Sequence, residues 1–318
     1  MKTVLYPFLL AVAFLSAASL AATDNSAELG KQRKEAQKAR QQQVSERSKA
    51  SNAAARAFRN YTREIKTQYG EQVRKLDTEF ELREVELKAE HEARVASAEA
   101  DYQKKVMALF MNPGGQFTEE ALEKMRAEAK AFSDALFELK KQAAEELQAA
   151  FIENEERKNA LWTEMDKKAL DKAESLGLTA SIAPVLASPI GDGLTDAEKR
   201  WNDREQRNAS KLEERNRHLL SEFRNGAELR KWEIGNLNED FRLTWEEKAK
   251  LQALDSEQGF YNTLLMQAAQ GGQVDQQKLM AQMAEINEQK KLVGIEYKKI
   301  RDKNRITRRE EQKAIVAK

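Results

Sequence analysis

The sequence GGQFTEEAL at residues 114–122 recurs as GGQVDQQKL at residues 271–279. Each copy lies between two long, highly charged segments with few helix-breaking residues. Glycine tolerates positive φ angles, so each Gly-Gly pair can end one helix and reverse the chain. We therefore predict that each stretch is the tip of an antiparallel helical hairpin.

The residues after each Gly-Gly pair favour the start of a second helix. Thr118 and Asp275 are good N-cap residues, because their side-chain oxygens can accept hydrogen bonds from the free N–H groups of the next turn. The apolar residue before each cap and the leucine that follows have the spacing of a hydrophobic staple. As exposed loop ends, the tips are also candidate partner-binding sites, at Gly114, Gly115, Gln116, Phe117, Gly271, Gly272, Gln273 and Val274.

The Gly-Gly-Gln tripeptide resembles the catalytic tripeptide of class I peptide-release factors, which act on peptidyl-tRNA. The resemblance is confined to residues 114–116 and 271–273. The chain is expected to be exported, as argued below, and its net charge of +1 is near neutral rather than basic. We therefore interpret the tripeptide as turn geometry.

Composition indicates an all-α fold of elongated antiparallel coiled-coil hairpins. Charged residues make up 34% of the 318 residues, and only 4 are proline. Such a composition, with apolar residues at helical spacing, is typical of long helices and coiled coils. The 54 basic and 53 acidic residues nearly balance, so the net charge alone predicts no strong ionic partner.

Residues 1–21 are expected to be a secretory signal peptide. Lys2 supplies the positive charge, residues 4–15 form a short apolar core, and small residues lie before a cleavage point near Ala21. The apolar run is shorter than the roughly 20 residues of a spanning helix, and no later segment is apolar enough to span a membrane. We expect a periplasmic or secreted protein; an uncleaved anchor is the alternative.

The periodicity predicts two tandem hairpins built from four long helices. The first hairpin is predicted at residues 22–175 with its tip near 112–117, and the second at residues 195–318 with its tip near 267–274. Thr195 and Glu198 form the pattern of a capping box. Gly226 and Gly235 are expected to weaken the third helix and to mark bends. The shared order of the two halves suggests an internal repeat.

Residues 176–194 interrupt the helical pattern with glycines and prolines and hold a single charge. This apolar linker separates the two hairpins. Its apolar side chains either fold against the bases of the hairpins or form an exposed loop that contacts a membrane or a partner. The candidate docking residues are Ile182, Val185, Leu186 and Ile190.

Both ends of the mature chain are basic. Residues 31–49 and residues 298–313 each hold many more Lys and Arg than Asp and Glu. Either these stretches are solvated helix faces, or they contact an anionic envelope surface such as lipid headgroups, lipopolysaccharide, cell-wall polymer or an acidic protein. Nucleic acid is not expected, because aromatic residues are not interleaved with these cations.

No catalytic constellation is found in the sequence. His91 and His218 lie far apart, and neither has a further His or Cys at metal-ligand spacing. Paired carboxylates are ordinary partners of Lys and Arg on solvated helix faces. We expect no enzymatic activity, cofactor or metal. The leading hypothesis is an exported structural or scaffolding protein that acts through protein–protein contacts. These contacts can include those of a homo-oligomer.

Two other functions stay open. The plan is similar to that of Skp-like periplasmic chaperones, whose helical hairpin arms project from an oligomeric base and clasp unfolded outer-membrane proteins. This resemblance is one of architecture and signal peptide, and the small β-rich base of those chaperones has no matching strand pattern here. The third hypothesis is a helical pore-forming toxin component, with residues 176–194 as the inserting segment.

Overall fold

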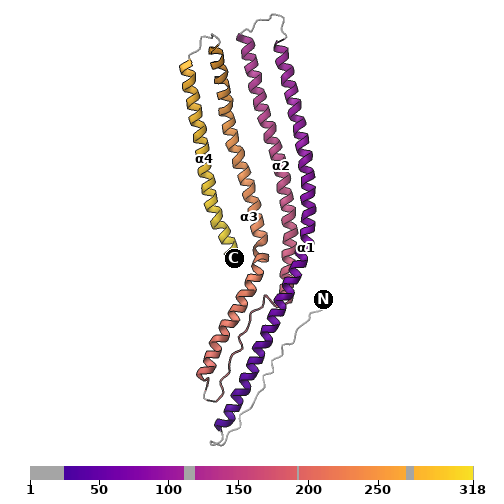
Figure 1. Ribbon diagram of the computed structural model, residues 1–318, viewed down its shortest axis with the longest axis vertical. Helices are drawn as coiled ribbons and strands as arrows, with labels where there is room; N and C mark the ends of the chain where they lie inside the picture. The colour runs from indigo at the N-terminus through magenta and orange to yellow at the C-terminus, as the bar shows by residue number, and fades with distance from the viewer. Residues whose placement is uncertain (1–24, 111–118, 192, 270–275, 318) are drawn as a thin grey trace. The chain divides into compact units, whose positions relative to one another are not determined.

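The computed structural model describes residues 25–110, 119–191, 193–269 and 276–317, and over these ranges it contains four long α-helices and no strand. The predicted all-α fold is confirmed. The helices are α1 (Asn25–Phe110), α2 (Glu119–Ser175), α3 (Asp196–Ala269) and α4 (Gln276–Ala317) (Figure 1). Residues 1–21, the predicted signal, and most of the two predicted tips lie outside the described residues.

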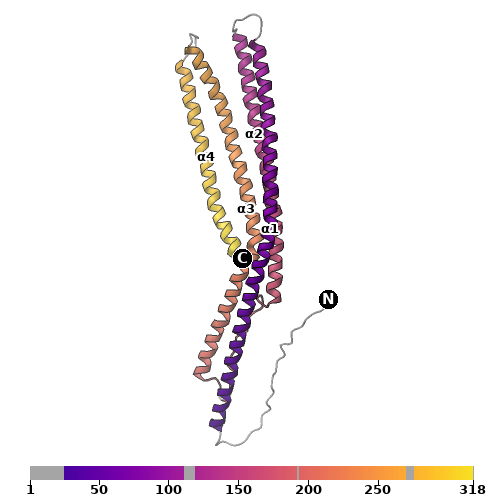
Figure 2. The ribbon, with the colours of Figure 1, turned by 45° about the vertical axis from the view of Figure 1, so that its right-hand side comes forward.

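Helices α1 and α2 pair in antiparallel orientation (Figures 1 and 2). The hydrogen bond from Tyr69 to Glu164 joins residues 95 apart in sequence. Further along α1, the Arg94–Glu146 pair joins residues 52 apart, and the pair formed by Lys105 joins residues only 23 apart. The shrinking separation shows that the chain reverses between the two helices, as a hairpin requires.

Helices α3 and α4 form a second hairpin in the same way. The hydrogen bond from Trp232 to Glu311 spans 79 residues, the Arg301–Glu247 pair spans 54, and the bond from Gln258 spans only 29. Both predicted chain reversals are therefore confirmed by the pairing of the helices that flank them.

The chain packs into two units, and α1 and α3 contribute to both. Of the described residues, unit 1 comprises those within 25–54 and 180–215, and unit 2 comprises those within 55–179 and 216–317. The two hairpins are defined by the points where the chain reverses, whereas the two units are defined by which segments of the chain pack against each other.

In unit 1, α1 and α3 run parallel to each other. Arg40 lies 3.8 Å from Glu198, and Arg47 pairs with Glu205. Both partners advance by seven residues from one pair to the next, which only a parallel arrangement allows. Glu205 is only 2% exposed, so this pair lies inside the seam between the two helices.

Local signals mark the two ends of the linker. After α2, Gly177 adopts a positive φ of 70°, and Leu178 donates a hydrogen bond of 2.9 Å to the carbonyl of Ala173, which completes a Schellman motif. Before α3, the predicted capping box is confirmed: Thr195 N–H donates to Glu198 Oε2 at 2.8 Å, and Glu198 N–H donates to Thr195 Oγ1 at 3.3 Å. The hydrogen bond from the Thr195 backbone lowers the pKa of the Glu198 carboxyl.

The core of unit 2 is a series of aromatic and small-residue contacts along the helix seams. Phe58 of α1 is 1% exposed and meets Phe223 of α3 edge to face, with ring centroids 5.6 Å apart. Tyr102 and Phe132 stack between α1 and α2 at 4.2 Å. Phe137 and Trp245 join α2 to α3 at 6.1 Å, so aromatic residues connect all three helices.

The two glycines expected to mark bends both lie inside α3. The helix continues without interruption through Gly226 and Gly235. At Gly226, an added Cβ would lie 2.9 Å from both an Arg230 nitrogen and an Asp166 oxygen. Glycine here leaves room for an ion pair between α3 and α2, whereas nothing lies within 4 Å of a Cβ added at Gly235.

Replacing Phe58 by alanine should destabilise unit 2 strongly. The side chain is fully buried, and truncation of a buried Phe costs about 3–5 kcal/mol through lost burial and the cavity left behind. Leu82→Ala is the matched control, because Leu82 lies on the same helix and is 65% exposed. Urea unfolding followed by circular dichroism at the helical band measures both variants, and equal losses of stability for the two would contradict this packing.

Candidate functional site

The basic stretch at residues 298–313 lies on α4, and part of it faces α3. Arg301 Nη2 lies 2.5 Å from a Glu247 carboxylate oxygen. Arg308 donates to Asp240 at 2.8 Å and to Glu239 at 3.1 Å. The hydrogen bond to Asp240 raises the pKa of Arg308. These arginines therefore hold the α3–α4 hairpin together.

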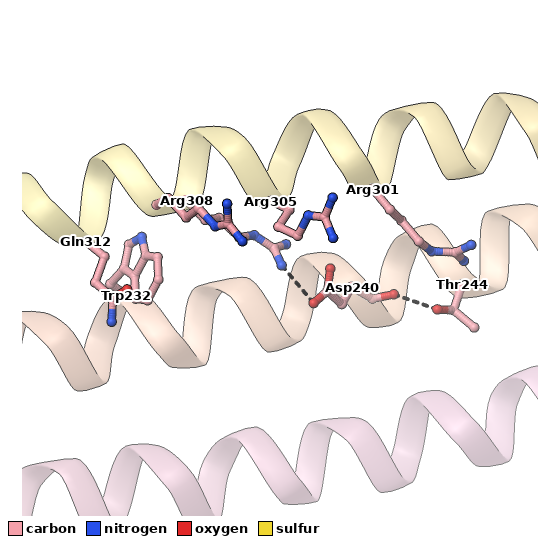
Figure 3. Close-up of a pocket in the computed structure, with 8 residues that line it drawn as sticks. Trp232, Asp240, Thr244, Arg301, Arg305, Arg308 and Gln312 are labelled. Carbon is pink, nitrogen blue, oxygen red and sulfur yellow. Dashed lines mark hydrogen bonds and ion pairs between the residues drawn. The ribbon is translucent and has the colours of Figure 1, made fainter.

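A groove of about 530 Å³ runs between α3 and α4 beside these pairs (Figure 3). Arg301, Arg305 and Arg308 of α4 line it, and Arg308 reaches Asp240 of α3. Arg305 pairs with Asp302 of its own helix at 3.2 Å. Each of these three arginines thus already faces a carboxylate, so an anion entering the groove would have to compete with it.

The remaining cations of the stretch lie on exposed positions of α4. Lys298, Lys299, Lys303 and Arg309 are all exposed, and Arg309 also lines the groove. Within the part of the chain that the structure describes, none of the four forms an ion pair with a carboxylate. These side chains are the ones free to meet an anionic partner.

The basic stretch at residues 31–49 is used differently from what either sequence-based alternative expected. Arg33, Arg40 and Arg47 recur every seven residues and turn into unit 1. Of the basic residues in this stretch, only the lysines are exposed, at Lys31, Lys34, Lys38 and Lys49. The seven-residue spacing of these arginines, together with that of Glu198 and Glu205, was the signal in the sequence for a parallel α1–α3 seam.

The linker in unit 1 is an extended segment whose backbone is held by side chains of both helices. From α1, Arg33 donates to the Ile190 carbonyl at 2.7 Å, and Arg47 donates to the Ala183 carbonyl at 3.1 Å. Because these contacts use main-chain atoms, they fix the path of the linker with little dependence on its side chains.

Helix α3 completes this arrangement with three polar side chains. Trp201 Nε1 donates to the Val185 carbonyl at 2.9 Å, and a Glu213 carboxylate oxygen accepts from the Ile182 N–H at 2.8 Å. The Asn202 amide accepts from the Ala187 N–H at 2.6 Å and donates to the carbonyl of the same residue at 3.5 Å. We name Arg33, Arg47, Trp201, Asn202 and Glu213 the backbone clamp.

The structure places four of the predicted docking residues in this linker. Ile182, Val185 and Ile190 are half-buried, and Leu186 is 43% exposed. The first three take part in the clamp through their backbones, so the segment lies against the helices of unit 1. The other eight predicted docking residues lie outside the described residues, at Gly114, Gly115, Gln116, Phe117, Gly271, Gly272, Gln273 and Val274.

Unit 2 contains a buried polar cluster that sequence reasoning did not find. Asp166 of α2 is 4% exposed and accepts a hydrogen bond of 2.6 Å from Arg230 of α3. Arg230 also donates from Nε to Asn159 at 2.9 Å. Burial raises the pKa of the Asp166 carboxyl, and Arg230 acts in the opposite direction. This pair fastens α2 to α3, and Gly226 makes the space for it.

Over the described ranges, no helix combines the length and apolarity needed to cross a bilayer. No protein-family model, curated protein or solved structure matches the chain.

Replacing Arg230 by methionine should cost about 3 kcal/mol at neutral pH, because it leaves the buried Asp166 carboxylate without its counter-charge. Without Arg230 the already raised pKa of Asp166 rises further, so the folded variant binds a proton more tightly than its unfolded chain. The stability of the variant relative to wild type therefore falls as the pH rises from below 3.8, the ordinary value for this carboxyl, through the raised pKa.

Urea unfolding at several pH values tests this expectation. Arg242→Met is the control, since Arg242 is largely exposed in its pair with Glu246 and should change stability by less than about 0.5 kcal/mol. A further Asp166→Leu substitution in the Arg230→Met background should recover most of the loss. A loss that stays the same at acid and neutral pH would show that Asp166 is not the uncompensated group.

Proposed function

We propose that this chain is an exported, non-enzymatic scaffold protein that acts through contacts of its helix surfaces with other molecules. The length of the helices supports this proposal. Helix α2 has 57 residues, which corresponds to about 85 Å, and it packs within unit 2 alone. Helices of this length present long exposed faces and suit a spacer better than an enclosed reaction site.

The use of the buried charges gives further support. The buried ion pairs described above, Arg40–Glu198, Arg47–Glu205 and Asp166–Arg230, each connect two helices. Their partners account for the positions of these side chains without a substrate. Export rests on the signal pattern of residues 1–21.

The observation that carries the proposal is the basic half of α4. This segment combines cations that fasten α3 with other cations that point outward and pair with no carboxylate among the described residues. Outward cations without counter-charges favour contact with an anionic molecule of the cell envelope. A homo-oligomer is compatible with this proposal, because such contacts strengthen when several copies bind together.

Small-angle X-ray scattering of the mature chain tests the scaffold role. A compact protein of this length would have a radius of gyration of about 20 Å. We expect a clearly larger radius, because α2 alone is about 85 Å long. A radius of gyration near the compact value in a monomeric sample would contradict the scaffold proposal.

A holdase for unfolded membrane proteins is a second candidate, and the backbone clamp of unit 1 favours it. The clamp already holds an extended apolar segment through its main chain, which is how a chaperone can bind clients of differing sequence. In this hypothesis the linker occupies the place beside α1 and α3 that a client segment would take.

The holdase hypothesis predicts that loosening the linker increases client binding. Asn202→Ala removes the two hydrogen bonds to Ala187 and should improve suppression of aggregation of a denatured β-barrel membrane protein, followed by light scattering. Asn208→Ala is the matched control on an exposed position of the same helix and should behave as wild type. If neither wild type nor Asn202→Ala slows aggregation at equimolar ratio, the chain is not a holdase.

A further inference from the structure

Helix α4 has a second apolar face that is not covered by α3. Tyr297 is 3% exposed and marks the face that packs on α3. Ile306 follows nine residues later, which places it about 180° around the helix, and it is 62% exposed. Leu292 and Ile295 are 58% and 50% exposed. At about 100° per residue, these three exposed side chains fall within roughly 60° of one another.

Cations surround these apolar side chains. The same rotation per residue places six exposed Lys and Arg side chains within a sector of about 140° that includes the three apolar ones. Between residues 291 and 313, the only acidic residues in this sector are Asp302 and Glu310, which pair with Arg305 and Lys313. The six cations are Lys291, Lys298, Lys299, Lys303, Lys313 and, at the edge of the sector beside the groove that it also lines, Arg309.

We call these nine residues the outer face of α4: the three exposed apolar side chains and the six cations. A second copy of the chain is a poor occupant for this surface, because a two-fold contact would bring the same cations together. A soluble polyanion would satisfy the cations but would leave the leucine and the two isoleucines in water. The surface of an anionic bilayer offers both a layer of phosphates and an apolar interior beneath it.

We propose that the outer face of α4 docks on a bilayer that contains anionic phospholipid. The six cations pair with lipid phosphates, and Leu292, Ile295 and Ile306 insert between the headgroups while α4 lies along the membrane plane. The opposite face of the helix stays packed on α3, so docking requires no unfolding of the hairpin. This inference rests on the proposed scaffold function and specifies the anionic envelope surface as lipid.

Co-sedimentation of the full chain with vesicles tests this docking. We expect binding to mixed phosphatidylglycerol–phosphatidylcholine vesicles and at least tenfold weaker binding to pure phosphatidylcholine. Binding should weaken as salt is raised, because salt screens the cations. Replacing Lys298, Lys299, Lys303 and Arg309 together by Gln should weaken binding more than about 100-fold, since each cation near an anionic surface contributes about fivefold.

The apolar contribution is tested separately. The double variant Ile295→Gln and Ile306→Gln keeps every charge and should weaken vesicle binding about tenfold or more, while leaving binding to heparin, a soluble polyanion, unchanged. Both positions are at least half exposed, so the fold should tolerate the change, and circular dichroism verifies it. Leu82→Gln, on an exposed position of α1, is the apolar control.

The charge control replaces Lys75, Lys130, Lys167 and Lys231 by Gln, all exposed and outside α4. It removes as many charges as the α4 variant and should reduce binding far less. If the double isoleucine variant binds vesicles as tightly as wild type, the outer face is a general polyanion-binding site, and the bilayer assignment is overturned. If the chain does not bind vesicles but has a large radius of gyration, only the membrane-docking inference is overturned. A compact radius of gyration overturns the scaffold proposal itself.

Discussion

Every helix in this chain depends on burying its apolar stripe against a neighbouring helix. An isolated helix gains too little from its own hydrogen bonds to stay folded in water, and most of its stability comes from packing one face. The reversals between α1 and α2 and between α3 and α4 provide two of the required partners. The hairpin pairs are then fastened by ion pairs and aromatic contacts at intervals along their length. The rest of the structure follows from which faces remain after this pairing.

The beginning of α1 shows how a long helix is stabilised beyond its hairpin partner. Residues 25–54 lie in unit 1, where their neighbours are the linker and the start of α3. The parallel seam there depends on arginines spaced by seven residues, which match glutamates with the same spacing. Arg33, the first of these arginines, instead donates to carbonyls of the linker. Arginines of α1 therefore bind both α3 and the linker.

The sequence was most informative where a signal is local. The Thr195 capping box, the glycine that ends α2 at Gly177 and the two reversals all depend on residues within a few positions of one another. The parallel α1–α3 seam was missed because its partners lie more than 150 residues apart, so no local pattern connects them. The role of Gly226 in making room for Arg230 and Asp166 was missed for a related reason, since that space exists only once α2 and α3 are packed.

The distribution of cations on α4 shows why composition alone could not separate a structural role from a binding role. Arg301 and Arg308 reach carboxylates of α3, whereas Lys298 and Lys299 do not. Residues three or four apart share a face of a helix, and neighbours in sequence point in different directions. A basic stretch that covers several turns must therefore serve more than one face. On α4 the face toward α3 uses its cations to hold the hairpin. The opposite face, with its exposed isoleucines, carries charge and apolarity that no other described part of the chain matches.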